Sequence, residues 1–146
     1  MSENVKLRRR DVIAASRAFE TLAQRAKEDD CDQQYQVRVL ARRLRGLFDA
    51  HEDAAALEGV LLRKYALQRG GKYITDERGG LQLDAGKGEQ HAAEHRAMML
   101  EQVEVTMERL LTPADFDRLG VMPGIIMAQL EPFIAAAPDG VPDGAT

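Results

Sequence analysis

The residues best suited to chemistry are His91, Glu94 and His95, which form the pattern H-x-x-E-H of the inverted zinc-protease signature. On a helix the two imidazoles would lie one turn apart on one face, as two zinc ligands require, with Glu94 beside them as a candidate base. A catalytic zinc also needs a third protein ligand, and Glu101 and Glu104 follow too closely along the same segment to supply it. We therefore interpret the motif as a polar helix face, keep His91 and His95 as the metal candidates, and expect no cofactor.

The other reactive side chains do not form a catalytic set. His51 lies on the apolar stripe of a predicted helix, where we interpret it as a hydrogen-bonded core or interface histidine. The single cysteine, Cys31, stands between two aspartates, a setting that disfavours a nucleophilic thiolate. We expect no histidine near Ser2 or Ser16 that could act as a base. We therefore expect a protein that is not an enzyme.

Basic side chains are grouped on one predicted helix. Arg38, Arg42 and Arg45 fall on a single helical face, and Arg43 is adjacent to it. Together with the basic run over 6–10, these arginines could contact phosphate groups. No aromatic residues alternate with them and no helix-turn-helix pattern is present, so the sequence favours a protein partner over nucleic acid.

Charge is divided unevenly along the chain of 146 residues. Residues 1–46 carry eleven basic side chains against seven acidic ones, a net charge of +4, whereas residues 47–146 carry −8 and the whole chain −4. This polarity suits head-to-tail assembly or an acidic partner, although a solvated helix surface also explains it. One cysteine cannot form an intramolecular disulfide, and no membrane span or signal peptide is recognised, so we expect a cytoplasmic protein.

Composition and periodicity predict a mainly α fold with a small β-hairpin. The chain has no Trp, 4 Phe and 3 Tyr, so its core must come mostly from Ala, Leu, Val, Ile and Met. Apolar residues recur every three or four positions over about 7–28 and again over about 33–68 without a proline. We expect these two helices to form a long antiparallel hairpin over about 7–69, with the second helix as one uninterrupted rod.

Glycines mark the weak points and the end of that second helix. Gly46 and Gly59 each cost roughly 1 kcal/mol relative to alanine in a helix. Gly70 and Gly71 follow it and are suited to the left-handed conformation of a helix C-cap. A rod of this length must pack along a partner helix or project towards a neighbouring subunit.

Shorter elements are expected next. Alternating residues around a glycine-rich loop predict a β-hairpin over about 72–84, and a helix follows over about 88–100. The segment 102–108 alternates like a strand that could join the hairpin, whereas continuation of the preceding helix to Leu111 is the rival interpretation.

The C-terminal part is predicted to contain short helices up to about residue 136. Two of them begin at prolines, Pro113 and Pro123, which suit the first positions of a helix. Together these elements predict a single helical domain over 1–137, followed by a flexible tail of turn residues over 138–146.

A set of short motifs runs in order through the C-terminal half of the chain. They are Leu61-Leu-Arg-Lys-Tyr65, the glycine-rich hairpin 72–84, Met98-Met-Leu-Glu101, Val103-Glu-Val105, Met122-Pro123 and Leu130-Glu-Pro-Phe-Ile134. This half of the chain resembles a family of small, uncharacterised bacteriophage and prophage proteins. It departs from that family at Gln68-Arg69-Gly70, where such proteins place glycine directly after the tyrosine, and in its proline-rich tail.

The resemblance implies a phage context and offers no active site to transfer. We therefore expect a non-enzymatic phage or prophage protein of the virion or its assembly, located in the host cytoplasm or the virion. It would act by protein–protein contact, through self-association or with other phage structural proteins. A small phage inhibitor that binds a host enzyme or defence complex is the alternative, and a zinc-dependent hydrolase acting through the H-x-x-E-H pattern is the third.

Overall fold

The computed structural model describes residues 2–120 and 122–135, and the tail predicted over 138–146 lies outside the described residues. The mainly helical class with small antiparallel sheets is confirmed. Within the described ranges, no helix combines the length and apolar character needed to cross a bilayer. The elements in chain order are β1 (Glu3–Arg8), α1 (Arg9–Arg25), α2 (Cys31–Arg43), α3 (Arg45–Lys64), β2 (Gln68–Arg69), β3 (Lys72–Tyr73), the 3₁₀ helix η1 (Ala85–Lys87), α4 (Gly88–Leu100), β4 (Gln102–Met107), the 3₁₀ helix η2 (Pro113–Leu119), α5 (Gly124–Leu130) and the 3₁₀ helix η3 (Glu131–Phe133).

A two-stranded antiparallel sheet pairs β1 with β4, and Val5 lies opposite Val105 in its register. Val105 and Met107 are buried while Glu104 and Thr106, which alternate with them, are exposed, and this accounts for the alternation visible in the sequence. Of the two interpretations left open for this segment, the strand is therefore correct and continuation of the preceding helix is wrong. Its partner is the N-terminal strand β1, however, and not the hairpin over 72–84.

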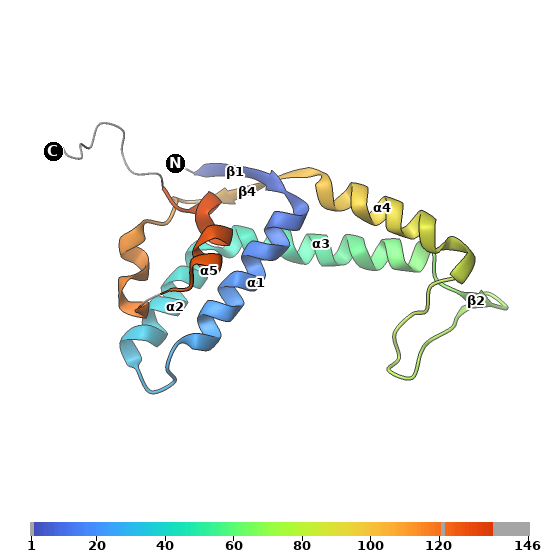
Figure 1. The fold of residues 1–146 in the computed structure, drawn as a ribbon, viewed down its shortest axis with the longest axis horizontal. Helices are drawn as coiled ribbons and strands as arrows, with labels where there is room; N and C mark the ends of the chain where they lie inside the picture. Colours follow the sequence, from blue (N-terminus) through green and yellow to red (C-terminus); the bar gives the residue numbers. More distant parts are fainter. Residues whose placement is uncertain (1, 121, 136–146) are drawn as a thin grey trace.

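α1 follows β1 directly and keeps its predicted apolar stripe. Val12, Phe19 and Leu22 are buried, and the helix packs mainly against α3 and α5 (Figure 1). The chain turns back after α1 as predicted. The expected start of this helix at Leu7 is wrong because Leu7 belongs to β1.

The uninterrupted helix expected over 33–68 is wrong, since the chain changes direction at Leu44 between α2 and α3 (Figure 1). Leu44 has φ −91° and ψ 14°, outside regular helix values. Next to it, a Cβ atom on Gly46 would collide with the carbonyl oxygen of Thr106, so α3 approaches β4 very closely there. Leu44 and Leu47 both remain fully buried, and the apolar repeat therefore continues through the bend and conceals it.

A small β ribbon follows α3. Thr75 pairs with Leu81 across a turn in which Asp76 Oδ1 accepts hydrogen bonds from the backbone N–H groups of Arg78 and Gly80, at 2.8 and 2.9 Å. These contacts confirm the predicted hairpin in this part of the chain.

The ribbon gains its third segment from the residues just before the hairpin. β2 pairs with β3 across Gly70 and Gly71, whose φ angles are +58° and +78°. Positive φ at both central residues is what a two-residue type I′ turn requires. The prediction that these glycines cap the preceding helix is therefore wrong, because that helix already ends at Lys64.

The C-terminal short helices are confirmed. Thr112 and Asp115 form a capping box at the start of η2, with Pro113 in the first turn. The end of η3 lies beside Leu111, whose N–H donates a hydrogen bond to the carbonyl oxygen of Phe133 at 2.8 Å. This closes the C-terminal segment against the rest of the protein.

The molecule has a body that contains the core and an arm that lies outside it. The core cluster draws on α1, α2, the first turns of α3, the β1–β4 sheet, η2, α5 and η3. We call residues 51–101 the arm. It consists of most of α3, the β ribbon and α4, which runs antiparallel to α3, with the ribbon at the far end (Figure 1). No described residue of the arm belongs to the core cluster.

Candidate functional site

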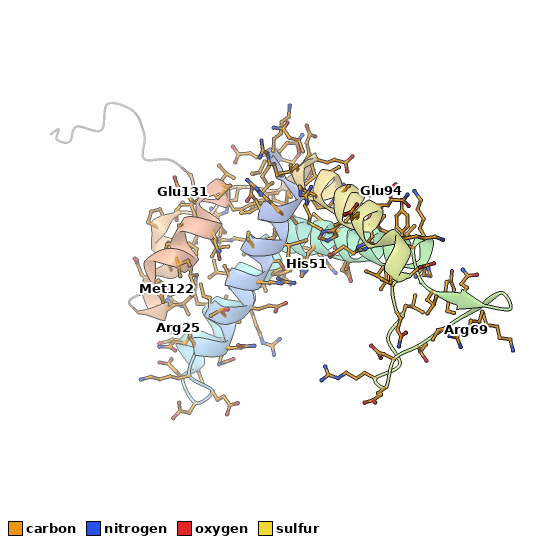
Figure 2. The ribbon with its side chains drawn as sticks, turned by 45° about the vertical axis from the view of Figure 1, so that its right-hand side comes forward. Arg25, His51, Arg69, Glu94, Met122 and Glu131 are labelled. Atoms are coloured by element: carbon orange, nitrogen blue, oxygen red, sulfur yellow. The ribbon has the colours of Figure 1, made fainter. Side chains whose placement is uncertain are left out.

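The H-x-x-E-H residues lie on α4, as predicted, in the arm (Figure 2). The rings of His91 and His95 stack one turn apart, with centroids separated by 5.9 Å. His95 Nε2 lies 2.9 Å from Glu58 Oε2 on α3, so one of the two imidazoles already has a carboxylate partner.

Glu94 turns towards α3 and contacts two donors there. Its carboxylate accepts hydrogen bonds from Lys64 Nζ and the Tyr65 hydroxyl, both at 2.8 Å. These two bonds, that of Lys64 first, hold the pKa of Glu94 below its ordinary value, and in return the carboxylate raises the pKa of Lys64 and of Tyr65. A carboxylate stabilised in its charged form is a poor general base.

This polar cluster ties α4 to α3. In the described ranges, no three His, Cys, Asp or Glu side chains gather closely enough to hold a metal ion. The third ligand that a catalytic zinc would need is therefore missing from the described neighbourhood of His91 and His95. What the geometry supports is a set of hydrogen bonds and ring contacts that fixes the two helices of the arm.

A serine–histidine pair escaped the sequence analysis. Ser16 Oγ on α1 lies 2.7 Å from His51 Nδ1 on α3, so the expectation that Ser16 has no histidine nearby is wrong. Ser16 is only 2% exposed, which places its hydroxyl out of reach of a substrate. The interpretation of His51 as a hydrogen-bonded histidine on the buried face of its helix is confirmed.

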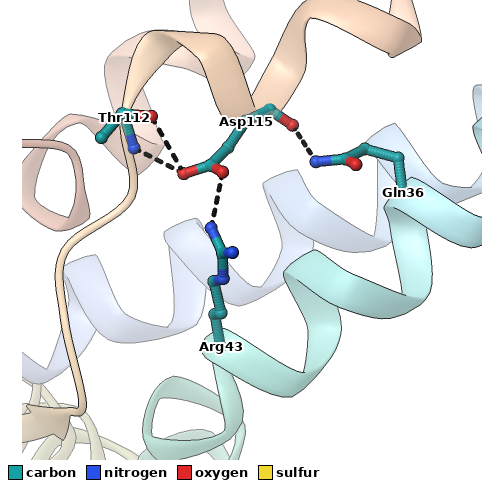
Figure 3. Close-up of polar contacts among 4 residues, drawn as sticks. All are labelled: Gln36, Arg43, Thr112 and Asp115. Carbon is teal, nitrogen blue, oxygen red and sulfur yellow. Dashed lines mark hydrogen bonds and ion pairs between the residues drawn. The ribbon is translucent and has the colours of Figure 1, made fainter.

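The four predicted arginines divide into two groups. Arg43 points towards η2, where its Nη1 lies 2.5 Å from Asp115 Oδ1 (Figure 3). The other carboxylate oxygen accepts hydrogen bonds from Thr112, and Gln36 Nε2 donates to the backbone carbonyl of Asp115. Partial burial opposes ionisation of Asp115, but the bonds from Thr112 and Arg43 outweigh it and hold its pKa below the ordinary value.

Arg38 and Arg42 on α2 and Arg45 in the first turn of α3 stay exposed. Two adjoining concavities of about 600 and 650 Å³ share Arg42. The first also contains Tyr35, and the second contains Arg109 from the segment after β4. We name Arg38, Arg42, Arg45 and Arg109 the arginine face. The expectation that no aromatic residue accompanies these arginines is therefore wrong, and the spacing of three residues between Tyr35 and Arg38 could have shown it.

A groove lies along α3, between that helix and residues of α1 and β4 in the body. It encloses about 450 Å³, and Leu57 and Val60 within it are 41% and 55% exposed. Its walls are Ala50, Asp53, Ala56, Leu57 and Val60 of α3, Val103 and Glu104 of β4, and Arg9 of α1. We call it the α3 groove. Exposed branched side chains at helical spacing form the kind of unpaired seam that helices bury against a partner.

Comparison with known proteins adds no relative, because no family model, curated protein or solved structure matches this chain.

Proposed function

We propose that this chain is a non-enzymatic phage or prophage protein that acts by protein–protein contact in virion structure or assembly. The observation that carries the proposal is the arm, whose apolar residues are left outside the core cluster of the body. The phage-like order of motifs in the C-terminal half supplies the biological context. The copies of the protein itself are the first partners proposed.

Apolar burial inside the arm is limited to α3 and the residues just after it, at Ala54, Leu61, Tyr65 and Ala66. α4 buries none of its residues, and the polar cluster around Glu94 fastens it to α3. Leu57 and Val60 meanwhile face solvent along two turns of α3. Burial of apolar area yields roughly 25 cal/mol per Å², so covering this seam is a favourable term for association.

The charge along the exposed face of α3 suits pairing with a second, antiparallel α3. Asp49 and Asp53 lie on the exposed face before the apolar turns, and Arg63 lies on that face after them. In an antiparallel pair centred near residue 58, Asp53 of each copy would meet Arg63 of the other, and Ala56 would meet Val60. Such an isologous contact makes two ion pairs at the rim of one apolar strip.

The chemistry of the histidine and serine clusters is consistent with a non-enzymatic role. The carboxylate of Glu94 and one ring of the H-x-x-E-H pair are engaged with side chains of α3, and Ser16 is buried. These groups serve to hold elements together. A protein that works by contact needs a rigid arm more than an accessible reactive group.

The solution mass of the full chain tests the proposal. Light scattering over a range of concentrations is expected to show a reversible dimer, and Leu57→Ser to shift the protein towards monomer. Gln68→Ser in the exposed β2 strand is a matched control outside the groove, and it should leave the mass unchanged. A strict monomer with no affinity for capsid or tail proteins would contradict the proposed role.

A further inference from the structure

A second surface, the arginine face, lies on the body, with three of its members around the bend between α2 and α3. All four of its arginines are exposed, and two adjoining concavities connect them through Arg42. Tyr35 stands beside them with 63% of its surface exposed. One face of the body therefore presents four cations and an aromatic ring together, on a chain whose net charge is −4.

Structural roles leave most of this charge unexplained. Among the described residues, no carboxylate lies within ion-pair distance of the arginine face. The nearby Asp115 is paired with Arg43 instead. Arg42 in the last turn of α2 complements the helix dipole. Arg45 does the opposite, because it lies in the first turn of α3, where a positive charge is unfavourable. Glu108 is the acidic residue that lines the same concavity.

We propose that the arginine face binds single-stranded nucleic acid, with phosphates on the arginines and a base stacked on Tyr35. Arg38 and Arg42 lie one helical turn apart, about 5–6 Å, so that they can meet successive phosphates of one strand. An exposed tyrosine ring offers a stacking platform to any unpaired base. In a duplex the bases are already stacked, so Tyr35 selects the single strand. This inference is independent of the role proposed for the arm.

Fluorescence anisotropy with labelled 20-nucleotide oligo(dT), oligo(U) and a DNA duplex tests the inference on the full chain. Three to four phosphate contacts predict a slope of about −2 to −3 for log affinity against log salt, from the value of roughly −0.7 per contact on a single strand. Both single strands offer phosphates and unpaired bases, so both should bind more tightly than the duplex. Their ratio shows whether DNA or RNA is preferred.

Variants separate the two parts of the site. Arg42→Ser with Arg45→Ser should flatten the salt slope by one to two and weaken binding at least tenfold at low salt. Tyr35→Ala should weaken single-strand binding by about fivefold or more, whereas Tyr35→Phe keeps the ring and the affinity. Arg69→Ser with Arg78→Ser in the ribbon removes the same charge elsewhere and serves as the control.

Any one of the following results would overturn the inference. If binding is absent, or if its affinity does not depend on salt, the arginines do not contact phosphates. If the ribbon control loses as much affinity as the Arg42→Ser, Arg45→Ser variant, the binding is general electrostatic attraction and not a specific site. Duplex binding as tight as single-strand binding, or a Tyr35→Ala variant that binds like the unchanged protein, would remove the stacking contact.

Discussion

The guanidinium of Arg43 lies 2.5 Å from the carboxylate of Asp115, although 72 residues separate them in the chain. The same carboxylate accepts a hydrogen bond from the backbone N–H of Thr112 at 2.7 Å and so caps η2 (Figure 3). One side chain thus begins a 3₁₀ helix and fastens it to α2. Both side chains of the pair are largely covered, which reduces screening by solvent.

Replacing this carboxylate should lower the free energy of unfolding. Asp115→Asn loses the ion pair with Arg43 and weakens the cap, with an expected cost of about 1–3 kcal/mol. Urea denaturation followed by circular dichroism measures it. Asp117→Asn on the same 3₁₀ helix is exposed and should change stability by less than about 0.5 kcal/mol, so equal effects of the two variants would count against the role given to Asp115.

The contribution of Asp115 should also depend on pH in a defined direction. Its pKa in the folded protein lies below the ordinary aspartate value of 3.8, so the stabilisation is complete above that value and is lost as pH falls through the folded pKa. The stability difference between the unchanged protein and Asp115→Asn should therefore be constant near neutral pH and shrink in acid. Denaturation curves from about pH 7 to pH 3 test this, and a difference that grows in acid would refute it.

Gly46 and Gly59 should respond to alanine with opposite signs. A Cβ at position 46 collides with the backbone of β4, so Gly46→Ala should destabilise the protein by about 1–3 kcal/mol. At position 59 the nearest atom is Arg63 Nη1 at 3.6 Å, an ordinary contact, and the gain in helix propensity should stabilise by up to about 1 kcal/mol. Thermal unfolding at low protein concentration compares the two, and a neutral Gly46→Ala would contradict the close packing of α3 on β4.

The Ser16–His51 hydrogen bond should be structural. Ser16→Ala leaves the partner nitrogen of His51 without its hydrogen bond inside the protein and should cost roughly 1 kcal/mol in unfolding free energy. Chemical denaturation measures this loss, with Ser2→Ala at the exposed N-terminus as the neutral control. A Ser16→Ala variant as stable as the control would show that the bond contributes nothing.

Residue types and spacing within a few positions predicted the elements whose ends are set by neighbouring residues. Pro113 and Pro123 mark the starts of C-terminal helices. The alternation around Val105 indicated the strand, although it left continuation of the preceding helix open. Pairings over long sequence distances were missed. Val105 of that strand pairs with Val5, 100 residues earlier in the chain, so no local pattern could reveal the partner.

The bend at Leu44, the Ser16–His51 pair and the Arg43–Asp115 pair also depend on contacts between residues far apart in the sequence. The apolar repeat continues through Leu44 because α2 and α3 bury the same side of the chain there. The sequence does not show that Gly46 packs against the backbone of β4, which is the contact at the bend. Sequence grouped Arg43 with the exposed arginines because its partner Asp115 lies on a distant element. Spacing grouped Arg38, Arg42 and Arg45 correctly, whereas Arg109 joins them from a distant part of the chain.

Sedimentation equilibrium of charge-reversed variants tests the pairing of α3 with a second copy most directly. Asp53→Arg and Arg63→Asp each place like charges opposite one another in an antiparallel pair, so each variant alone should weaken the dimer about tenfold or more. The double variant restores opposite charges at both ends and should recover most of the affinity. If the double variant is as monomeric as the single variants, or if all of them associate like the unchanged protein, the α3 groove is not where the copies meet.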